Sequence, residues 1–289
     1  MDVNIKCAAQ KCTFIRHVNI SNNGGTHCCL SCKLNNNIHG VRCAKSPYIE
    51  EVCNICNIIQ KYDICNPWPR DNVRCSNCYS LVRERAVKYV LDTYYNNFKN
   101  KKIHQSSPCG PLHNLFLTFP EYSYSHYIKS VENGSYLNGI QCVNLEKIPF
   151  PDNTYDIFLT MDVFEHLFNP EIAIKEIYRV LKPGGVYIMT VPIENLESKT
   201  EKACFLDSEN KVVHIPTNRS SIKQVELEYH GNPIDNSGSV VTYYYGYDII
   251  NMIESETNFK CKNFFKRKED NINELGILGT FKDVFVCKK

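Results

Sequence analysis

Residues 155–192 place the strongest constraint on the fold. Their beginning, residues 157–161, is a short apolar run of the kind typical of a strand buried on both faces. Pro170 suits the first position of a helix, with Asn169 as a possible N-cap, and apolar residues then recur at helical spacing: Ile172, Ile174, Ile177, Val180 and Leu181. The sequence Lys-Pro-Gly-Gly at 182–185 is predicted to end this helix before a second buried strand at 186–191. Strand, helix and strand with short joints predict a right-handed crossover in a parallel sheet.

The same stretch carries a family resemblance. The strings Asp162-Val-Phe-Glu-His166 and Glu176-Ile-Tyr-Arg-Val-Leu-Lys-Pro-Gly-Gly185 resemble the type 11 group of class I S-adenosylmethionine (SAM) methyltransferases. The resemblance implies an α/β fold: a Rossmann-like, seven-stranded sheet, mostly parallel with one antiparallel strand. Residues 155–192 would then supply its fourth strand, fourth helix and fifth strand. A different doubly wound enzyme could share such a crossover, but the string from Asp162 to His166 argues against that alternative.

Composition limits the class of protein. At 289 residues the chain can bury a large core, and its formal net charge of +2 makes no broad electrostatic demand for nucleic acid or membrane. No stretch approaches the roughly twenty apolar residues that a membrane-spanning helix needs. The N-terminus lacks the apolar segment of a signal peptide. We therefore expect a cytoplasmic protein without a membrane partner.

Cysteines are concentrated near the N-terminus. Of 16 in the chain, 11 lie between Cys7 and Cys78, and in a reducing compartment such crowding indicates metal rather than disulfides. The spacing Cys53-x2-Cys56-x18-Cys75-x2-Cys78 is a strong zinc-ribbon signal. Cys65 is left over and could be a small apolar residue.

A second group of possible zinc ligands comes earlier in the chain. It consists of Cys29, Cys32, His39 and Cys43, which supply three thiolates and an imidazole. Cys28 could replace Cys29, His27 is a spare, and Cys7 and Cys12 could belong here or be free thiols. For any of these cysteines the alternative is a buried, inert thiol.

The N-terminal module, residues 1–80, is predicted to hold structural zinc, because four protein ligands leave no open coordination position. Lysines and arginines are scattered there and its aromatics form no stacking row, so nucleic acid binding is possible but not favoured. Several type 11 relatives carry a similar ribbon followed by a Ser-Leu sequence with two arginines, which Ser80-Leu81-Val82-Arg83-Glu84-Arg85 resembles. Residues 81–289 would form the SAM-dependent domain, beginning with a helix that runs to about Asn97.

The cofactor site implied by the resemblance follows this helix. Residues 102–107 are expected to form the first strand, and a turn with one glycine follows, where the family has a glycine-rich turn. Small side chains would let the backbone approach the methionine part of SAM. The residues assigned to this turn are Ser106, Ser107, Pro108 and Gly110.

The next two strands, near 123–127 and 139–143, complete the cofactor site. Ser125 and His126 stand where the family binds the ribose, usually with an acidic residue; a neutral imidazole accepts one hydrogen bond only. Leu145 could cover the adenine, and Asn144 or Glu146 could accept from its amino group. Asp162 and Val163 follow the fourth strand. Ligands in such sheets bind beyond the carboxyl ends of the strands.

The last part, residues 190–289, is expected to face the acceptor. Weak periodicity through residue 220 fits an insertion over the pocket, and a loop with His230 resembles the family's acceptor loop. His166 and His230 are candidate general bases because imidazole titrates near neutral pH, while Asp162 would orient cofactor or acceptor. Each histidine could instead be an ordinary structural or surface residue. A last helix from Asp248 and two closing strands, near 258–261 and 282–287, are expected.

The function predicted from the sequence is methyl transfer from SAM to a small-molecule or sugar hydroxyl or amine, with glycan or nucleotide-sugar modification favoured. One rival is an RNA base methyltransferase whose ribbon binds RNA. The other is a degenerate fold that acts as a binding scaffold, an alternative motivated by the single-glycine turn and His126.

Overall fold

The computed structural model describes residues 48–63, 73–95, 97–195, 199–216, 226–231, 238–265, 275, 277 and 282–289. The chain divides into two compact units. The first comprises residues 1–89, 110–112 and 267–282, and the second comprises 90–109, 113–266 and 283–289. The expected zinc ligands Cys29, Cys32, His39 and Cys43, like Cys65, lie outside the described residues.

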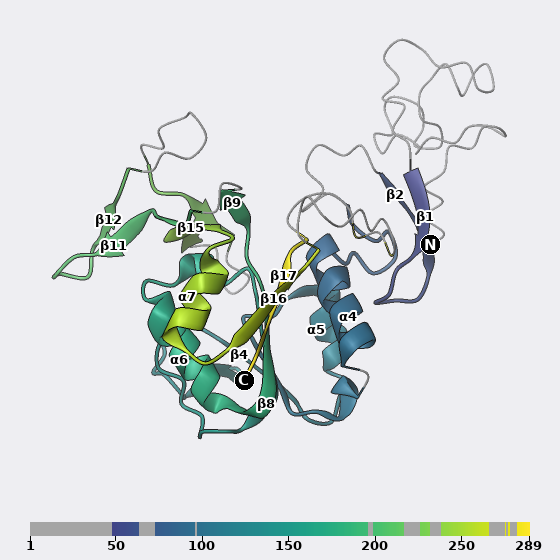
Figure 1. Cartoon of the computed structure of the whole chain (residues 1–289), viewed down its shortest axis with the longest axis horizontal. Helices are drawn as coiled ribbons and strands as arrows, with labels where there is room; N and C mark the ends of the chain where they lie inside the picture. The colour runs from purple at the N-terminus through teal and green to yellow at the C-terminus, as the bar shows by residue number, and fades with distance from the viewer. Residues whose placement is uncertain are drawn as a thin grey trace, which may run out of the picture. The chain divides into compact units, whose positions relative to one another are not determined.

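An eight-stranded mixed sheet forms the centre of the second unit, and Figure 1 labels its strands β4, β8, β16 and β17. The strand order is β16-β17-β8-β7-β3-β4-β6-β5. Five neighbouring strands, β8, β7, β3, β4 and β6, are parallel. Their bounds are β3 Ile103–Ser106, β4 Tyr122–His126, β6 Ile140–Cys142, β7 Tyr155–Met161 and β8 Leu181–Thr190. The Rossmann-like, mostly parallel sheet inferred from the sequence is therefore present.

The sheet differs from the expected one at both edges. β5 (Tyr136–Leu137) adds an eighth strand, antiparallel to β6, through a short hairpin. At the other edge β17 (Val284–Lys288) runs antiparallel to both β8 and β16 (Lys260–Phe264). Cys261 and Cys287 are opposite one another in this pairing and form a disulfide. The expectation of seven strands with one antiparallel strand was therefore wrong: the sheet has eight strands, and both β5 and β17 are antiparallel. Strand β5 was missed because it is too short to give an alternating pattern.

The crossover β7-α6-β8 forms as expected, but its helix ends earlier. Helix α6 spans Pro170–Val180, and residues 182–185 lie within β8 instead of capping the helix. Gly184 has φ +76°, and a Cβ on Gly185 would lie 2.9 Å from the Lys182 carbonyl oxygen, so glycine is required where β8 begins against β7. Asn169 occupies the N-cap position without a side-chain cap hydrogen bond.

The main core lies between the sheet and helices α6 and α7 (Ile249–Glu256), which pack beside β8 and β16 (Figure 1). Ile174, Ile177 and Tyr187 are fully buried there. Burying each aliphatic side chain stabilises the fold by about 1.5–3 kcal/mol. This layer fixes where β7 and β8 end, and therefore where the residues that follow them lie.

The remaining elements are short. Helix α4 spans Val82–Tyr94 and α5 spans Gly110–Phe116, and the 3-10 turns are η1 (Phe98–Asn100) and η2 (Phe164–His166). The other strands are β1 Tyr48–Val52, β2 Ile59–Asp63, β9 Ile193–Asn195, β10 Glu201–Lys202, β11 Cys204–Leu206, β12 Val212–His214, β13 Tyr229–His230, β14 Ser239–Val240 and β15 Tyr243–Gly246. Among the described residues, no helix has the length and hydropathy to cross a membrane.

Candidate functional site

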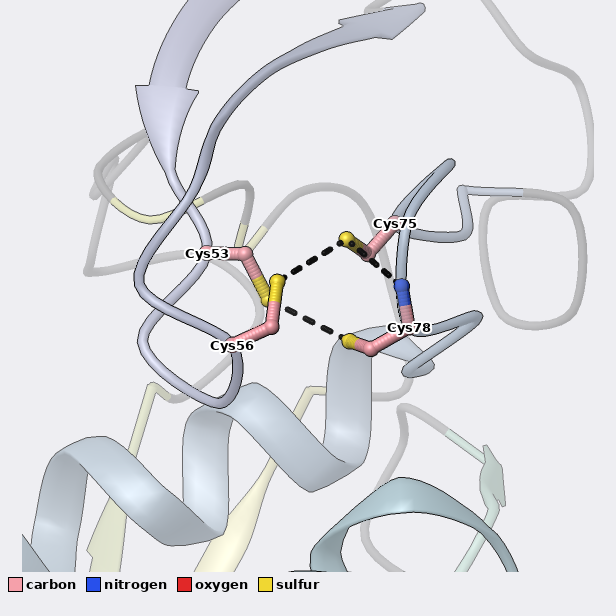
Figure 2. Close-up of side chains that lie close together, drawn as sticks. All are labelled: Cys53, Cys56, Cys75 and Cys78. Carbon is pink, nitrogen blue, oxygen red and sulfur yellow. Dashed lines mark hydrogen bonds between the residues drawn. The ribbon is translucent and has the colours of Figure 1, made fainter. Parts of the chain in front are cut away.

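Four cysteines of the first unit converge. Cys53 and Cys56 come from the turn between β1 and β2, while Cys75 and Cys78 come from the turn before α4, and their side chains point toward one another (Figure 2). The Sγ atoms of Cys53 and Cys78 are 3.7 Å apart, and those of Cys56 and Cys75 are 3.6 Å apart. Four thiolates about 2.3 Å from a tetrahedral zinc ion are separated by about 3.8 Å, so the donor set fits zinc.

The two cysteine turns have the same backbone hydrogen bonds. In the first, the Asn57 N–H donates to the Cys53 carbonyl at 2.7 Å; in the second, the Tyr79 N–H donates to the Cys75 carbonyl at 2.9 Å. Asn57 and Tyr79 both have positive φ, 59° and 64°. A strained backbone that repeats at both turns is typical of a site that holds a ligand between them.

Helix α4 contacts the second cysteine turn through Arg85. Arg85 is fully buried, donates to the Ser80 carbonyl and, at 2.9 Å, to the Val73 carbonyl, and stacks over the Tyr62 ring. The Ser80 hydroxyl lies 3.3 Å from the sulfur atoms of both Cys53 and Cys78. These contacts give the Ser-Leu-Val-Arg-Glu-Arg sequence a role: it orients the cysteines, as outer groups around metal sites commonly do.

Glu84, on the same helix, joins two helix starts in the first unit. Its carboxylate accepts from the Leu81 N–H at 2.7 Å and from the Leu112 N–H at 3.0 Å, and burial raises its pKa. A Cβ on Gly110 would lie 2.8 Å from Glu84 Oε1. The glycine expected in the cofactor turn therefore has a packing reason of its own.

In the second unit, the carboxyl ends of the parallel strands form one edge of polar residues. The Ser107 N–H donates to the Ser125 carbonyl at 2.7 Å, and the Asp162 N–H donates to the Thr190 carbonyl at 2.9 Å. Ser107 and Asp162 both have positive φ, 51° and 52°, although neither is glycine. Such strain costs about 1–3 kcal/mol per residue and is concentrated at functional sites.

His126 contributes an unusual polar atom to this edge. Its side chain is buried, and its Nδ1 has no hydrogen-bond partner among the described residues. Burial and the nearby His113 lower its pKa to about 4, so the ring is neutral at pH 7. An unpaired buried nitrogen costs free energy unless a ligand satisfies it. A ribose hydroxyl is a donor of the kind that would do so.

The residues expected around the adenine have mixed surroundings. Leu145 is buried, while Asn144 accepts from the Glu146 N–H at 2.9 Å and so shapes its own turn. Both oxygens of Glu146 accept from Asn169, at 2.9 and 2.7 Å. Glu146 therefore anchors the start of α6, while Leu145 belongs to the hydrophobic core.

A third group lies just after β7. The His166 Nδ1–H donates to the Val240 carbonyl at 2.8 Å, and the His166 and His230 rings are perpendicular with centroids 5.2 Å apart. The Thr242 N–H and hydroxyl donate to the Glu165 carbonyl at 2.7 and 3.0 Å, which fastens the late segment onto η2. The structure thus brings the two candidate histidines together, 64 residues apart in sequence.

Sequence reasoning missed three residues of these sites. Glu165 is buried between His166 and the late segment, Thr190 donates to Asp162 Oδ1 at 2.9 Å, and Glu228 accepts from His230 Nε2 at 3.2 Å. Only Glu165 had a signal, its place in the string from Asp162 to His166. The other two depend on contacts between segments far apart in the chain.

One cleft of about 530 Å³ lies away from these groups. It is lined by Lys101, Asp156 and the glycines at 184 and 185, at the amino ends of β7 and β8. Ligands of parallel sheets bind at the opposite, carboxyl edge. Ser107 and Asp162 lie at that opposite edge, just after β3 and β7.

Comparison with known proteins bears on the segment that builds this edge. Residues 123–189 match the methyltransferase domain family. This methyltransferase-domain segment contains β5, β6, β7, α6 and nearly all of β4 and β8, and with them His126, Asn144 and Asp162. The match supports the class of SAM-dependent methyltransferases.

Relatives match over short segments. A probable S-adenosylmethionine-dependent methyltransferase of Mycolicibacterium smegmatis is 39% identical over 49 residues, 17% of this chain and 19% of its own length. An uncharacterized methyltransferase of Schizosaccharomyces pombe is 52% identical over 42 residues, 14% of this chain and 15% of its own. An uncharacterized protein of Methanocaldococcus jannaschii is 38% identical over 87 residues, 30% and 35% of the two chains. The chain thus spans about a third or less of the length of these relatives.

Among solved structures, an S-adenosylmethionine dependent methyltransferase from Mesorhizobium loti aligns over 71% of this chain and 98% of its own. Its sequence identity to this chain is 13% and its TM-score is 0.41.

Proposed function

We propose that the chain is a SAM-dependent methyltransferase that modifies a small-molecule or sugar hydroxyl or amine. The observation that carries the proposal is the strained carboxyl edge of the sheet, within and beside the methyltransferase-domain segment. There, the neutral His126 has a buried nitrogen without a hydrogen-bond partner in the described part of the chain. A glycan or nucleotide sugar is the acceptor we favour, because the formal net charge of +2 offers little attraction for RNA.

The residues present fit the cofactor in a modified form of the usual site. Ser106, Ser107 and Pro108 would hold its methionine part, since Ser107 adopts a left-handed conformation that glycine usually provides. Ser125 and His126 would receive the ribose, and Leu145 with Asn144 would receive the adenine. When bound, SAM supplies an electrophilic methyl group on a sulfonium.

The chain's own groups then have three tasks. Asp162, held by Thr190, and its neighbour Val163 would position the donor and acceptor, and a near-attack geometry supplies much of the rate acceleration. Water has to be excluded, because the positive charge of the donor disappears during transfer. His166 or His230, whose rings are in contact, would take the proton that the acceptor loses.

We further propose that Cys53, Cys56, Cys75 and Cys78 hold a structural zinc ion. The distances between their sulfur atoms and the matching backbone turns support this. Such an ion has four protein ligands and no open position, so it would stabilise the first unit and take no part in the transfer.

The experiment is a screen of acceptors with SAM labelled in its methyl group, with sugars, nucleotide sugars, small amines and RNA as candidates. We expect label in a small-molecule product. With that acceptor, His230→Ala should lower kcat by about 100-fold or more, while the Kd for SAM stays unchanged. His214→Ala, a half-exposed histidine of β12, is the control and should retain full activity.

Two outcomes would contradict parts of the proposal. Equal kcat values for His230→Ala and the parent would remove His230 from the reaction. Transfer to RNA alone, with retention on RNA that weakens as salt rises, would replace the small-molecule acceptor with nucleic acid.

A further inference from the structure

The group Glu165, His166 and His230 has the composition of a metal site. Each residue offers one ligand atom, and these atoms all lie within 4.8 Å of one another. Among the described residues only this group and the four cysteines satisfy that condition. His166 Nε2 lies 3.9 Å from Glu165 Oε1, which is too far for a direct hydrogen bond but close enough for one ion to bridge both atoms after a small side-chain rotation.

The other nitrogen of each imidazole is already held. The His166 Nδ1–H donates to the Val240 carbonyl at 2.8 Å, and His230 Nε2 lies 3.2 Å from Glu228 Oε1. Glu228 is itself held by the Tyr244 hydroxyl at 2.9 Å. Metal-binding histidines almost always donate their second ring N–H to a carbonyl or carboxylate in this way, which orients the ring and leaves the remaining nitrogen as a lone pair.

Burial adds a reason for a cation. The Glu165 side chain is 3% exposed, whereas those of His166 and His230 are 18% and 25% exposed. A buried carboxylate is stabilised when a cation or coordinated metal compensates its charge. The backbone carbonyl of Glu165 is fixed by Thr242, so the carboxylate is held on a rigid support.

We propose that Glu165, His166 and His230 bind a divalent transition-metal ion beside the carboxyl end of β7. Two imidazoles and one carboxylate favour Zn²⁺, Co²⁺, Ni²⁺ or Fe²⁺ over Mg²⁺ and Ca²⁺. Three protein ligands leave coordination positions open for water or an acceptor oxygen, in contrast to the closed site of four cysteines. The site is three residues from Asp162, so such an oxygen would lie near the proposed cofactor edge. An imidazole that binds the ion cannot also accept a proton, so with the ion bound the general-base role proposed for His166 and His230 would be replaced by the lowered pKa of the coordinated oxygen.

The test is titration of the full-length protein with Co²⁺, after loosely held metal has been removed by dialysis against a mild chelator. Calorimetry gives the stoichiometry, and visible absorption separates nitrogen and oxygen ligands from thiolates, because thiolates add an intense charge-transfer band. We expect one Co²⁺ per chain bound without that band. His230→Ala and Glu165→Gln should each weaken the affinity at least about 10-fold, while His214→Ala should leave it unchanged.

Circular dichroism and the zinc content of each variant report whether it is folded. We expect His230→Ala to keep the fold, because His230 lies on the short strand β13. No saturable Co²⁺ binding by the folded parent, or equal affinity of His230→Ala and His214→Ala, would overturn the inference. The experiments distinguish the metal site from the proposed methyl transfer. Co²⁺ binding without any labelled product would support the metal site and contradict methyl transfer. Labelled product without Co²⁺ binding would support methyl transfer and contradict the metal site.

Discussion

Single residues at the sheet edge have conformations that a sequence does not reveal. Ser107 and Asp162 adopt the left-handed region that favours glycine, and both follow parallel strands. The single-glycine turn, which motivated the scaffold alternative, therefore has a serine in place of a second glycine. The residue types of this turn predict a cofactor-binding turn only weakly, because the backbone dihedral angles are set by the strands on either side.

His104 provides a prediction at the residue scale. It is fully buried in β3 between the hydroxyls of Ser123 and Ser125, at 3.0 and 2.9 Å, and burial lowers its pKa to about 3. The unfolded chain binds this proton near pH 6.5, whereas the folded chain does not until about pH 3. Stability should therefore fall as the pH falls from about 6.5 toward 3.

Urea unfolding at several values between about pH 7.5 and pH 5 measures this effect. His104→Gln, which cannot gain a proton, should show a shallower loss of stability with falling pH than the parent protein. His126, with its own lowered pKa of about 4, keeps part of the slope in both proteins. Parallel slopes for parent and variant would show that His104 does not resist protonation in the fold.

At the scale of elements, the long and strongly periodic stretch was the most predictable. Strand β7, helix α6 and strand β8 all form within 155–190, since their apolar residues face a common core. The end of α6 was not predictable, because residues 182–185 lie within β8, in the register shift between its Leu181 and Val186 pairs with β7, instead of capping a helix. The contact of His166 with His230 depends on β13 and β15, which are too short to leave a pattern.

Glu84 supports a prediction at this scale, because its two carboxylate oxygens satisfy N–H groups at the starts of α4 and α5. Glu84→Gln keeps the shape but has only one acceptor oxygen, so one buried N–H loses its partner. We expect the free energy of unfolding to fall by about 1–3 kcal/mol. Glu121→Gln, at an exposed carboxylate, is the matched control. Equal melting temperatures for the two variants would contradict this role.

At the scale of the whole molecule, zinc binding by the N-terminal module can be tested separately from SAM binding at the methyltransferase-domain segment. If the cysteine and histidine group at 29–43 is also a site, the protein should contain about two tightly held zinc ions per chain. Cys56→Ser should lose one of them and unfold at a lower temperature, whereas Cys109→Ser, at an exposed cysteine outside the group of four, should lose none. Metal analysis by mass spectrometry measures both; a zinc content near zero in the parent would remove the module as described.

The most direct test of the central claim is calorimetric titration of the full-length protein with SAM. We expect a saturable heat with one SAM per chain, and a Kd that rises about 3- to 10-fold in His126→Ala, because one hydrogen bond to the ribose is lost. A parent protein that gives no heat and no thermal shift with SAM would contradict a cofactor site at this edge and favour a binding scaffold.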